Sequence, residues 1–256
     1  MHDPPEGSLY YTMAQTQKKL TPVKTCSILL LLFSLPAFPS GAGLGSSALR
    51  NPASKPPLDA ARLLGCFTRV PDESADCQVS LYLDLPVDND PAFVFNIPGA
   101  STGHCFLMLR KSGKTGSVSR VFGFTCAGIG ALSGYDVPGK LVDNSGHKFN
   151  AELDMRVSAS EFGRVTSRIL TRGSSPRYNL WNGNCVHYAL DLINALRPEH
   201  PILPPNPGTM DGHYGVGSVQ ALYILLAHMK ASGQADGEDI KVGVVDYAPI
   251  SSGTCG

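Results

Sequence analysis

The stretch HCFLMLRKSGKTGSVSRVFGFT, residues 104–125, decides the fold expected for this chain. Two strand-length runs, 104–111 and 118–125, flank the turn-forming segment SGKTGS, which contains two glycines. Runs of this kind joined by a short glycine-containing turn are typical of a β-hairpin. The stretch therefore predicts two antiparallel strands.

Further strands are expected on both sides of this hairpin. Residues 78–87 (QVSLYLDLPV) place an apolar residue at every second position, which is the period of a half-buried strand. Residues 148–157 (KFNAELDMRV) do the same and put Phe149 and Ala151 on one face. A glycine-rich loop is expected over 127–140, and a short strand over 240–247 within an otherwise loose tail.

Helices are expected after most of the strands. Ser158 and Glu161 have the spacing of a capping box, which predicts a helix that starts there. Helices are also expected over 184–196 (NCVHYALDLINAL) and about 218–230. This order of elements predicts the α+β class, with a small antiparallel sheet packed against the helix that bears Cys185 at its N-terminus.

The N-terminal residues have the features of a targeting signal. Lysines precede the apolar run 26–38 (CSILLLLFSLPAF), and small, turn-forming residues follow it. The run is shorter than the roughly 20 residues of a membrane span. Residues 1–45 are therefore expected to be a signal peptide, with an uncleaved N-terminal anchor or a buried core strand as alternatives. The protein would then be secreted or periplasmic, or else membrane-anchored.

The remaining chain divides by composition. Residues 46–65 are rich in turn formers and are expected to be a linker. Residues 66–235 are expected to form the folded domain, and residues 236–256 a C-terminal tail. The 21 Lys and Arg residues balance the 21 Asp and Glu residues, which disfavours nucleic acid or an anionic membrane as the main partner.

An exported chain would tend to pair its cysteines. Six of the seven cysteines remain if residues 1–45 are removed. Cys66 with Cys77 and Cys105 with Cys126 are the plausible pairs, and the pairing of Cys255 stays open.

Cys185 is the first candidate for chemistry. It stands directly behind the NGN turn of residues 182–184, at the start of a helix, where free N–H groups and the helix dipole stabilise a thiolate. The alternatives are a buried cysteine on the helix face or half of a disulfide. His187 follows by two residues, about 200° around a helix, so it is expected to point away from Cys185 and to be structural.

His104 and His147 are the candidate partners. His104 opens a strand behind a glycine-rich approach, where an imidazole could exchange a proton with the thiol of a packed helix. A strand-end histidine that only hydrogen-bonds locally is the alternative. His147 could orient His104 or act as the base itself. Asp143 and Asn144 could orient an imidazole, although a turn is the simpler explanation for them.

A zinc site is the competing use of the same residues. Cys185, His104 and His147 could supply three ligands, but the chain has no close ligand pair such as C-x₂-C or H-x₃-H. No metal or other cofactor is expected.

Four short motifs occur in a particular order: GHCFLMLR, VFGF, DNSGH and YNLWNGNC. Over about residues 98–196 they resemble a bacterial group within the circularly permuted papain-like superfamily, which includes NlpC/P60-like and lecithin:retinol acyltransferase-like proteins. The resemblance implies Cys185 as nucleophile, His104 as base and His147 as third residue. It also implies an oxyanion hole at the Cys185 N–H, supported by Asn182 or Asn184.

The resemblance leaves the substrate open. That group tends to have an acidic residue at position 187, where this chain has histidine, as the acyltransferase-like branch does. The expected function is an exported thiol hydrolase that cleaves an amide bond in a peptide, with cell-wall peptide as the first guess.

Two other functions stay open. One is an acyltransferase or lipid-directed thiol enzyme on the same scaffold. The other is a non-catalytic secreted binding module with a structural Cys185. A peptide or cell-wall substrate is the expected partner, and a membrane is expected only through an uncleaved N-terminal segment.

Overall fold

A computed structural model of the chain describes residues 55–93, 102–126, 136–173, 177–180, 183–203, 218–233 and 239–253. The expected signal peptide or anchor (1–45) and residues 46–54 of the expected linker (46–65) lie outside these ranges, as does Asn182. Among the described residues, no helix is long and apolar enough to cross a membrane.

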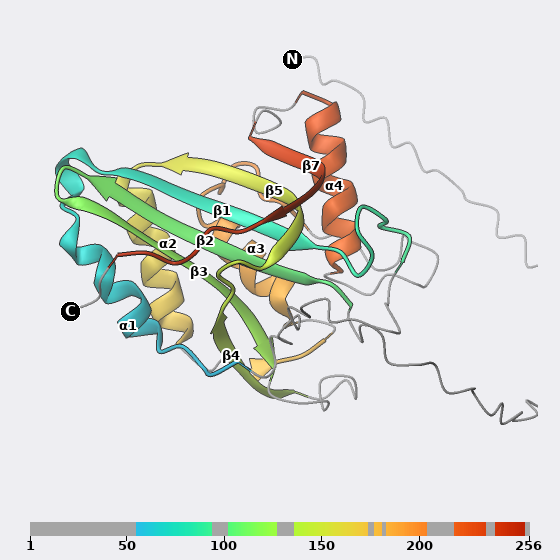
Figure 1. Cartoon of the computed structure of the whole chain (residues 1–256), viewed down its shortest axis with the longest axis horizontal. Helices are drawn as coiled ribbons and strands as arrows, with labels where there is room; N and C mark the ends of the chain where they lie inside the picture. The colour runs from blue at the N-terminus through green and yellow to red at the C-terminus, as the bar shows by residue number, and fades with distance from the viewer. Residues whose placement is uncertain are drawn as a thin grey trace, which may run out of the picture. The chain divides into compact units, whose positions relative to one another are not determined.

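The described residues form a mixed α/β fold built on one antiparallel sheet of seven strands, curled into a half-barrel (Figure 1). In chain order the strands are β1 (Asp76–Asp84), β2 (His104–Gly113), β3 (Gly116–Cys126), β4 (Val137–Asp143), β5 (Lys148–Val157), β6 (Arg177–Tyr178) and β7 (Ile240–Tyr247). Their order across the sheet is β6-β4-β3-β2-β1-β5-β7. The helices are α1 (Ala60–Gly65), α2 (Ala159–Arg172), α3 (Cys185–Asn194) and α4 (Val219–Ala231), with short 3₁₀ turns η2 (Cys66–Arg69) and η3 (Asp72–Ser74).

The central hairpin forms as the sequence predicts. β2 and β3 pair antiparallel up to Gly113 and Gly116, which face each other across the turn. The strands predicted over 78–87, 148–157 and 240–247 are also present as β1, β5 and β7. The loop predicted over 127–140 is wrong from Val137 onward, because β4 begins there and pairs first with β6 and, from Gly139, with β3. Residues 127–135 lie outside the described ranges.

The sheet has two different faces because side chains alternate along each strand. On one face, which we call the helix face, alternate residues of β1 and β2 pack with all four helices; Leu81, Cys105 and Leu107 are examples. On the other, which we call the front face, Tyr82 and Phe106 form a smaller apolar cluster.

Phe149 departs from the predicted alternation. It packs on Tyr82 of the front face, with ring centroids 4.7 Å apart, whereas Ala151 lies in the helix-face core. The pairing of β5 with β7 is irregular between these two residues. A local irregularity of this kind changes which side chains reach each face, so the prediction of a shared face is wrong for Phe149.

Side chains cap the helices that pack on the sheet. The capping box of Ser158 and Glu161 starts α2 as predicted. Asn184 caps α3, and Ser218 caps α4. Within the range expected to be a linker, Asp59 caps the short helix α1 by accepting from the Arg62 N–H at 2.7 Å.

The C-terminal residues are ordered over 239–253 rather than loose. After β7, residues Ala248–Gly253, which we call the strap, cross the front face of the sheet (Figure 1). Ser252 pairs with Ser119 of β3, and the Arg120 guanidinium donates to the carbonyls of Ser252 and Gly253. The strap therefore covers part of the front face and makes it concave.

The expected disulfides do not form. Cys77, Cys105, Cys126 and Cys185 carry free thiols, so the pairs Cys66–Cys77 and Cys105–Cys126 are wrong. Cys105 lies in the helix-face core and Cys126 packs against that core, so adjacent strands alone do not guarantee a bond. Cys66 is disulfide-bonded, but not to Cys77.

Candidate functional site

Three of the sequence motifs meet at one end of the front face. GHCF places His104 at the start of β2, VFGF places Gly123 in β3, and DNSGH places Asn144 and His147 between β4 and β5. Asp84, at the end of β1, pairs with His104 in the register of the sheet. We call His104, Asn144, His147 and Asp84 the histidine cluster.

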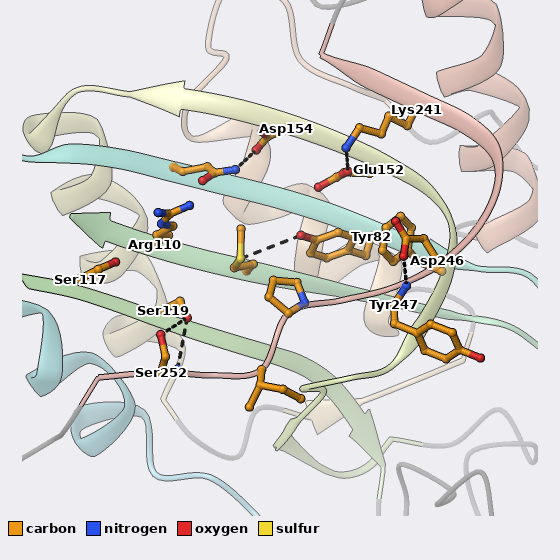
Figure 2. Close-up of a pocket in the computed structure, with 15 residues that line it drawn as sticks. Tyr82, Arg110, Ser117, Ser119, Glu152, Asp154, Lys241, Asp246, Tyr247 and Ser252 are labelled. Carbon is orange, nitrogen blue, oxygen red and sulfur yellow. Dashed lines mark hydrogen bonds and ion pairs between the residues drawn. The ribbon is translucent and has the colours of Figure 1, made fainter. Parts of the chain in front are cut away.

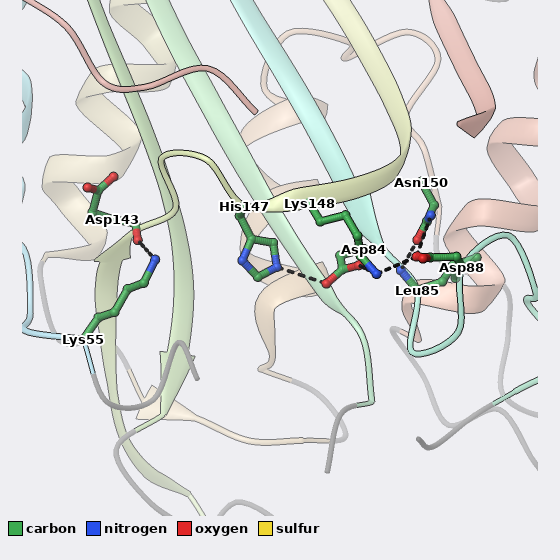
Figure 3. Close-up of polar contacts among 8 residues, drawn as sticks. All are labelled: Lys55, Asp84, Leu85, Asp88, Asp143, His147, Lys148 and Asn150. Carbon is green, nitrogen blue, oxygen red and sulfur yellow. Dashed lines mark hydrogen bonds and ion pairs between the residues drawn. The ribbon is translucent and has the colours of Figure 1, made fainter. Parts of the chain in front are cut away.

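His147 is held by a carboxylate. Its Nε2 atom lies 3.0 Å from Oδ2 of Asp84, and Lys148 Nζ lies 3.7 Å from the other oxygen (Figure 3). Lys148 also binds Asp88 at 2.5 Å, and the Lys148 ammonium lowers the pKa of that carboxyl group. The His147 ring is therefore oriented by Asp84 within a small charged network.

His104 is enclosed by this network. Only 8% of the residue is exposed, and its ring centroid lies 5.5 Å from that of His147. Burial, and then the charge of His147, lower the pKa of His104 to about 3. His104 is thus a neutral imidazole at physiological pH.

A close approach at Gly123 accommodates the cluster. A Cβ atom at this position would lie 2.6 Å from both His104 Nε2 and Asn144 Oδ1. Within the described part of the chain, neither of these two buried atoms has a hydrogen-bond partner. The glycine of the VFGF motif is therefore required by space rather than by backbone conformation.

Cys185 lies in a different environment. It is the first residue of α3, is 8% exposed and packs in the helix-face core. Burial raises the pKa of Cys185 to about 11, although the backbone N–H groups of Cys105 and Val186 act in the opposite direction. The thiol is therefore protonated and largely enclosed at neutral pH.

The structure does not bring Cys185 and His104 together. Cys105, which follows His104, faces Cys185 across the helix-face core. His104 is on the opposite side of the strand, where it stacks on Phe106 at 5.7 Å between ring centroids. The two side chains therefore lie on opposite faces of β2, and no hydrogen bond joins them among the described residues.

Asn184 and His187 have structural roles. The Asn184 side chain accepts from the N–H groups of Val186 and His187 and donates to the Leu180 carbonyl at 2.9 Å. His187 Nδ1 lies 3.0 Å from the same Asn184 oxygen. Asn184 therefore caps the helix instead of supporting an oxyanion, and Asn182 lies outside the described residues.

The sequence does not predict a cleft on the front face. A cavity of about 450 Å³ lies on the front face between the sheet and the strap (Figure 2). Its floor comes from β1, β2, β3 and β5, and its rim comes from β7 and the strap: Gln78, Tyr82, Met108, Arg110, Ser117, Ser119, Phe149, Glu152, Asp154, Lys241, Asp246, Tyr247, Pro249, Ile250 and Ser252.

The cleft is strongly polar and open to solvent. Glu152 and Lys241 form an ion pair of 2.7 Å within it. Asp154, Asp246 and Arg110 also line the cleft, and each has no ion-pair partner among the described residues. The pKa of Tyr82, on the floor, is raised by burial and by the neighbouring Glu152. Such a surface can bind a polar ligand through charge-assisted hydrogen bonds.

In the sequence, the cleft is indicated only by polar residues at alternate positions of two strands. Ser80, Tyr82 and Asp84 alternate with the apolar residues of β1, and Glu152 and Asp154 do so in β5. The strap that closes over them has no comparable pattern.

Within the described ranges, no group of three or more His, Cys, Asp or Glu residues could hold a metal ion. No protein-family model, no curated protein and no solved structure matches the chain.

Proposed function

We propose that this chain is a non-catalytic binding module that holds a short peptide in the front-face cleft. The observation that carries the proposal is the cleft itself: a solvent-open cavity of about 450 Å³ lined by charged, hydroxyl and aromatic side chains. A concave site with a few oriented polar groups is the usual form of a ligand site.

The surroundings of Cys185 also favour binding over thiol catalysis. A nucleophilic thiol needs a lowered pKa and a base within hydrogen-bond reach. Cys185 has a raised pKa, and His104 lies beyond the sheet with its own pKa lowered to about 3. Burial of this kind suits a structural cysteine.

One observation keeps the thiol hydrolase as a second candidate function. Cys185 starts α3, and the N–H groups of Val186 and Cys105 lie where they favour a thiolate. Hydrolysis would need a rearrangement that brings a base to the helix face. The acyltransferase alternative has the same requirement.

Blocking the cleft tests the proposal. Ser117 is exposed and lines the cleft, so Ser117→Trp should obstruct it. Lys114 is exposed in the adjoining β2–β3 turn but does not line the cleft, so Lys114→Trp is the matched control. The midpoint temperature of unfolding is measured with and without a mixture of di- to pentapeptides from a casein digest.

The proposal predicts a rise in midpoint for wild type, Cys185→Ala and Lys114→Trp, but not for Ser117→Trp. A ligand near a hundred times its Kd stabilises a protein by about 2.7 kcal/mol, and each kcal/mol shifts the midpoint by about 2–4 °C at this chain length. An equal rise in Ser117→Trp, or no rise in wild type, would overturn the proposal.

A further inference from the structure

We infer that the cleft selects a zwitterionic peptide of about three residues, with its amino terminus at Asp154 and its carboxyl terminus at Arg110. This inference rests on the proposed binding function and adds the chemical class and direction of the ligand. It follows from the charges that the cleft leaves without partners.

Asp154 is an oriented carboxylate without a cation of its own. Its Oδ1 atom accepts from Gln78 Nε2 at 2.7 Å (Figure 2). The same atom accepts from Ser80 Oγ at 2.8 Å. Both donors are neutral side chains of β1, and they leave Oδ2 available. A carboxylate fixed in this way can receive an ammonium group without losing further side-chain entropy.

The surroundings of Asp154 are acidic. Lys241 is the lysine that lines the cleft, and it faces three carboxylates. Its pKa is raised by its hydrogen bond to Glu152 and further by the charges of Asp154 and Asp246. One cation among three carboxylates leaves the β5–β7 side of the cleft with net negative charge.

Arg110 gives the opposite side of the cleft, on β2, a positive charge. Its Nε donates to Ser112 Oγ at 3.2 Å, and no carboxylate pairs with its guanidinium among the described residues. The side chain is exposed and lines the cleft. A guanidinium with free terminal N–H groups binds a carboxylate in a bidentate manner.

The register of the sheet sets the distance between these groups. Arg110 of β2 lies opposite Gln78 of β1, and Asp154 of β5 lies opposite Ser80 of β1. The Cα atoms of Arg110 and Asp154 are therefore two strand spacings apart across the sheet and two residues apart along it, about 12 Å. An extended tripeptide spans about 10 Å, which is comparable with this separation.

The centre of the cleft suits the middle of such a ligand. Met108 of β2 lies in the same row of the sheet as Asp154, and Tyr82 of β1 lies two residues further from Arg110; together they provide an apolar floor beside the charged groups. Tyr247 and Ile250 on the rim are 64% and 67% exposed, so they can close over a side chain of the ligand.

The test uses trialanine in three forms: with free termini, with an acetylated amino terminus and with an amidated carboxyl terminus. Each is titrated by isothermal titration calorimetry into the full chain. Free trialanine should bind saturably, and each blocked form should bind at least about tenfold more weakly, because one charge-assisted hydrogen bond is lost.

Two variants assign the ends. In Asp154→Asn, acetylation of the peptide should no longer weaken binding, whereas amidation still should. In Arg110→Gln the reverse is expected. Asp76→Asn and Arg156→Gln are matched controls, because both side chains are exposed neighbours that do not line the cleft.

The peptide modifications keep the test valid even if a variant loses stability. The inference is overturned if wild type binds the blocked forms as tightly as free trialanine, or if the two variants respond to the same blocked end. It is also overturned if the casein peptides raise the midpoint but free trialanine does not bind. In that case the binding function stands while the ligand class fails.

Discussion

At the residue scale, the protonation states of Cys185 and His104 follow from the faces of the sheet on which they are buried. Each is 8% exposed, but they are buried against different partners. Burial favours the uncharged form of both groups, which raises the pKa of the thiol and lowers that of the imidazole. These opposite shifts disfavour the thiolate–imidazolium pair that a cysteine hydrolase uses.

Iodoacetamide labelling tests the state of Cys185. With a pKa of about 11, about one thiol in a thousand is ionised at pH 8. Cys185 should therefore stay unlabelled in the folded protein at pH 8 and react after unfolding in urea, as measured by peptide mass spectrometry. Cys126 is less buried and should react first.

Labelling of the His104→Gln variant tests whether His104 activates the Cys185 thiol. The variant should label at Cys185 as slowly as wild type, because the sheet lies between the two side chains. Rapid labelling of wild type below pH 8 that the variant abolishes would contradict the structure.

The buried His104 should make stability depend on pH. Its pKa is about 3 in the folded protein and near the ordinary value of about 6.5 in the unfolded chain. The unfolded state therefore binds the extra proton between these values, so stability is lost as pH falls from about 6.5 to about 3. The slope from this group is about 1.4 kcal/mol per pH unit.

Urea unfolding from pH 7 to pH 4 measures this slope. His104→Gln should reduce the pH dependence, whatever its effect on stability at pH 7. His228→Gln is the control, because His228 is exposed on α4. An unchanged slope in His104→Gln would show that His104 is not held neutral by burial.

At the element scale, the sequence predicted strands wherever one face is apolar. β1 and β5 alternate clearly, and the glycines of the β2–β3 turn mark the hairpin. β4 was missed because Pro138 and Gly139 interrupt its pattern, and pairing with β3 overrides their preference for loops.

The orientation of His104 could not be predicted in the same way. In HCFLML both alternating sets are apolar, so period two does not say whether His104 shares the helix face. The packing of Cys105 against α3 decides the matter. The pairing of His104 with His147, Asn144 and Asp84 instead depends on the path of the connection between β4 and β5.

Two glycine substitutions test the packing of these elements. Gly123→Ala should destabilise the protein by about 1–3 kcal/mol, because the new Cβ would lie 2.6 Å from His104 Nε2 and Asn144 Oδ1. Gly163→Ala in α2 should stabilise it by about 0.4–1 kcal/mol, since nothing lies within 4 Å of the new Cβ. Chemical denaturation gives both values, and a neutral Gly123→Ala would refute the tight packing.

At the scale of the whole molecule, the strap turns one face of the sheet into a cleft. The helices cover the helix face, while Ala248–Gly253 cross the front face and leave Arg110 and Asp154 accessible (Figures 1 and 2). Polar strand positions could be predicted as outside the main core, but the cleft needs the strap to come back over β3. That contact joins residues more than 130 positions apart, beyond the reach of local patterns.

The most direct test of the central claim asks whether a bound peptide is changed. Wild type and Cys185→Ala are incubated with the casein peptides and, separately, with p-nitrophenyl acetate. Mass spectrometry then measures the masses of the peptides and of the protein. The account predicts that both proteins return the same intact peptides and that neither gains an acyl group at position 185. New fragments, or an acyl adduct on Cys185, formed by wild type alone would contradict it and make the chain a thiol enzyme.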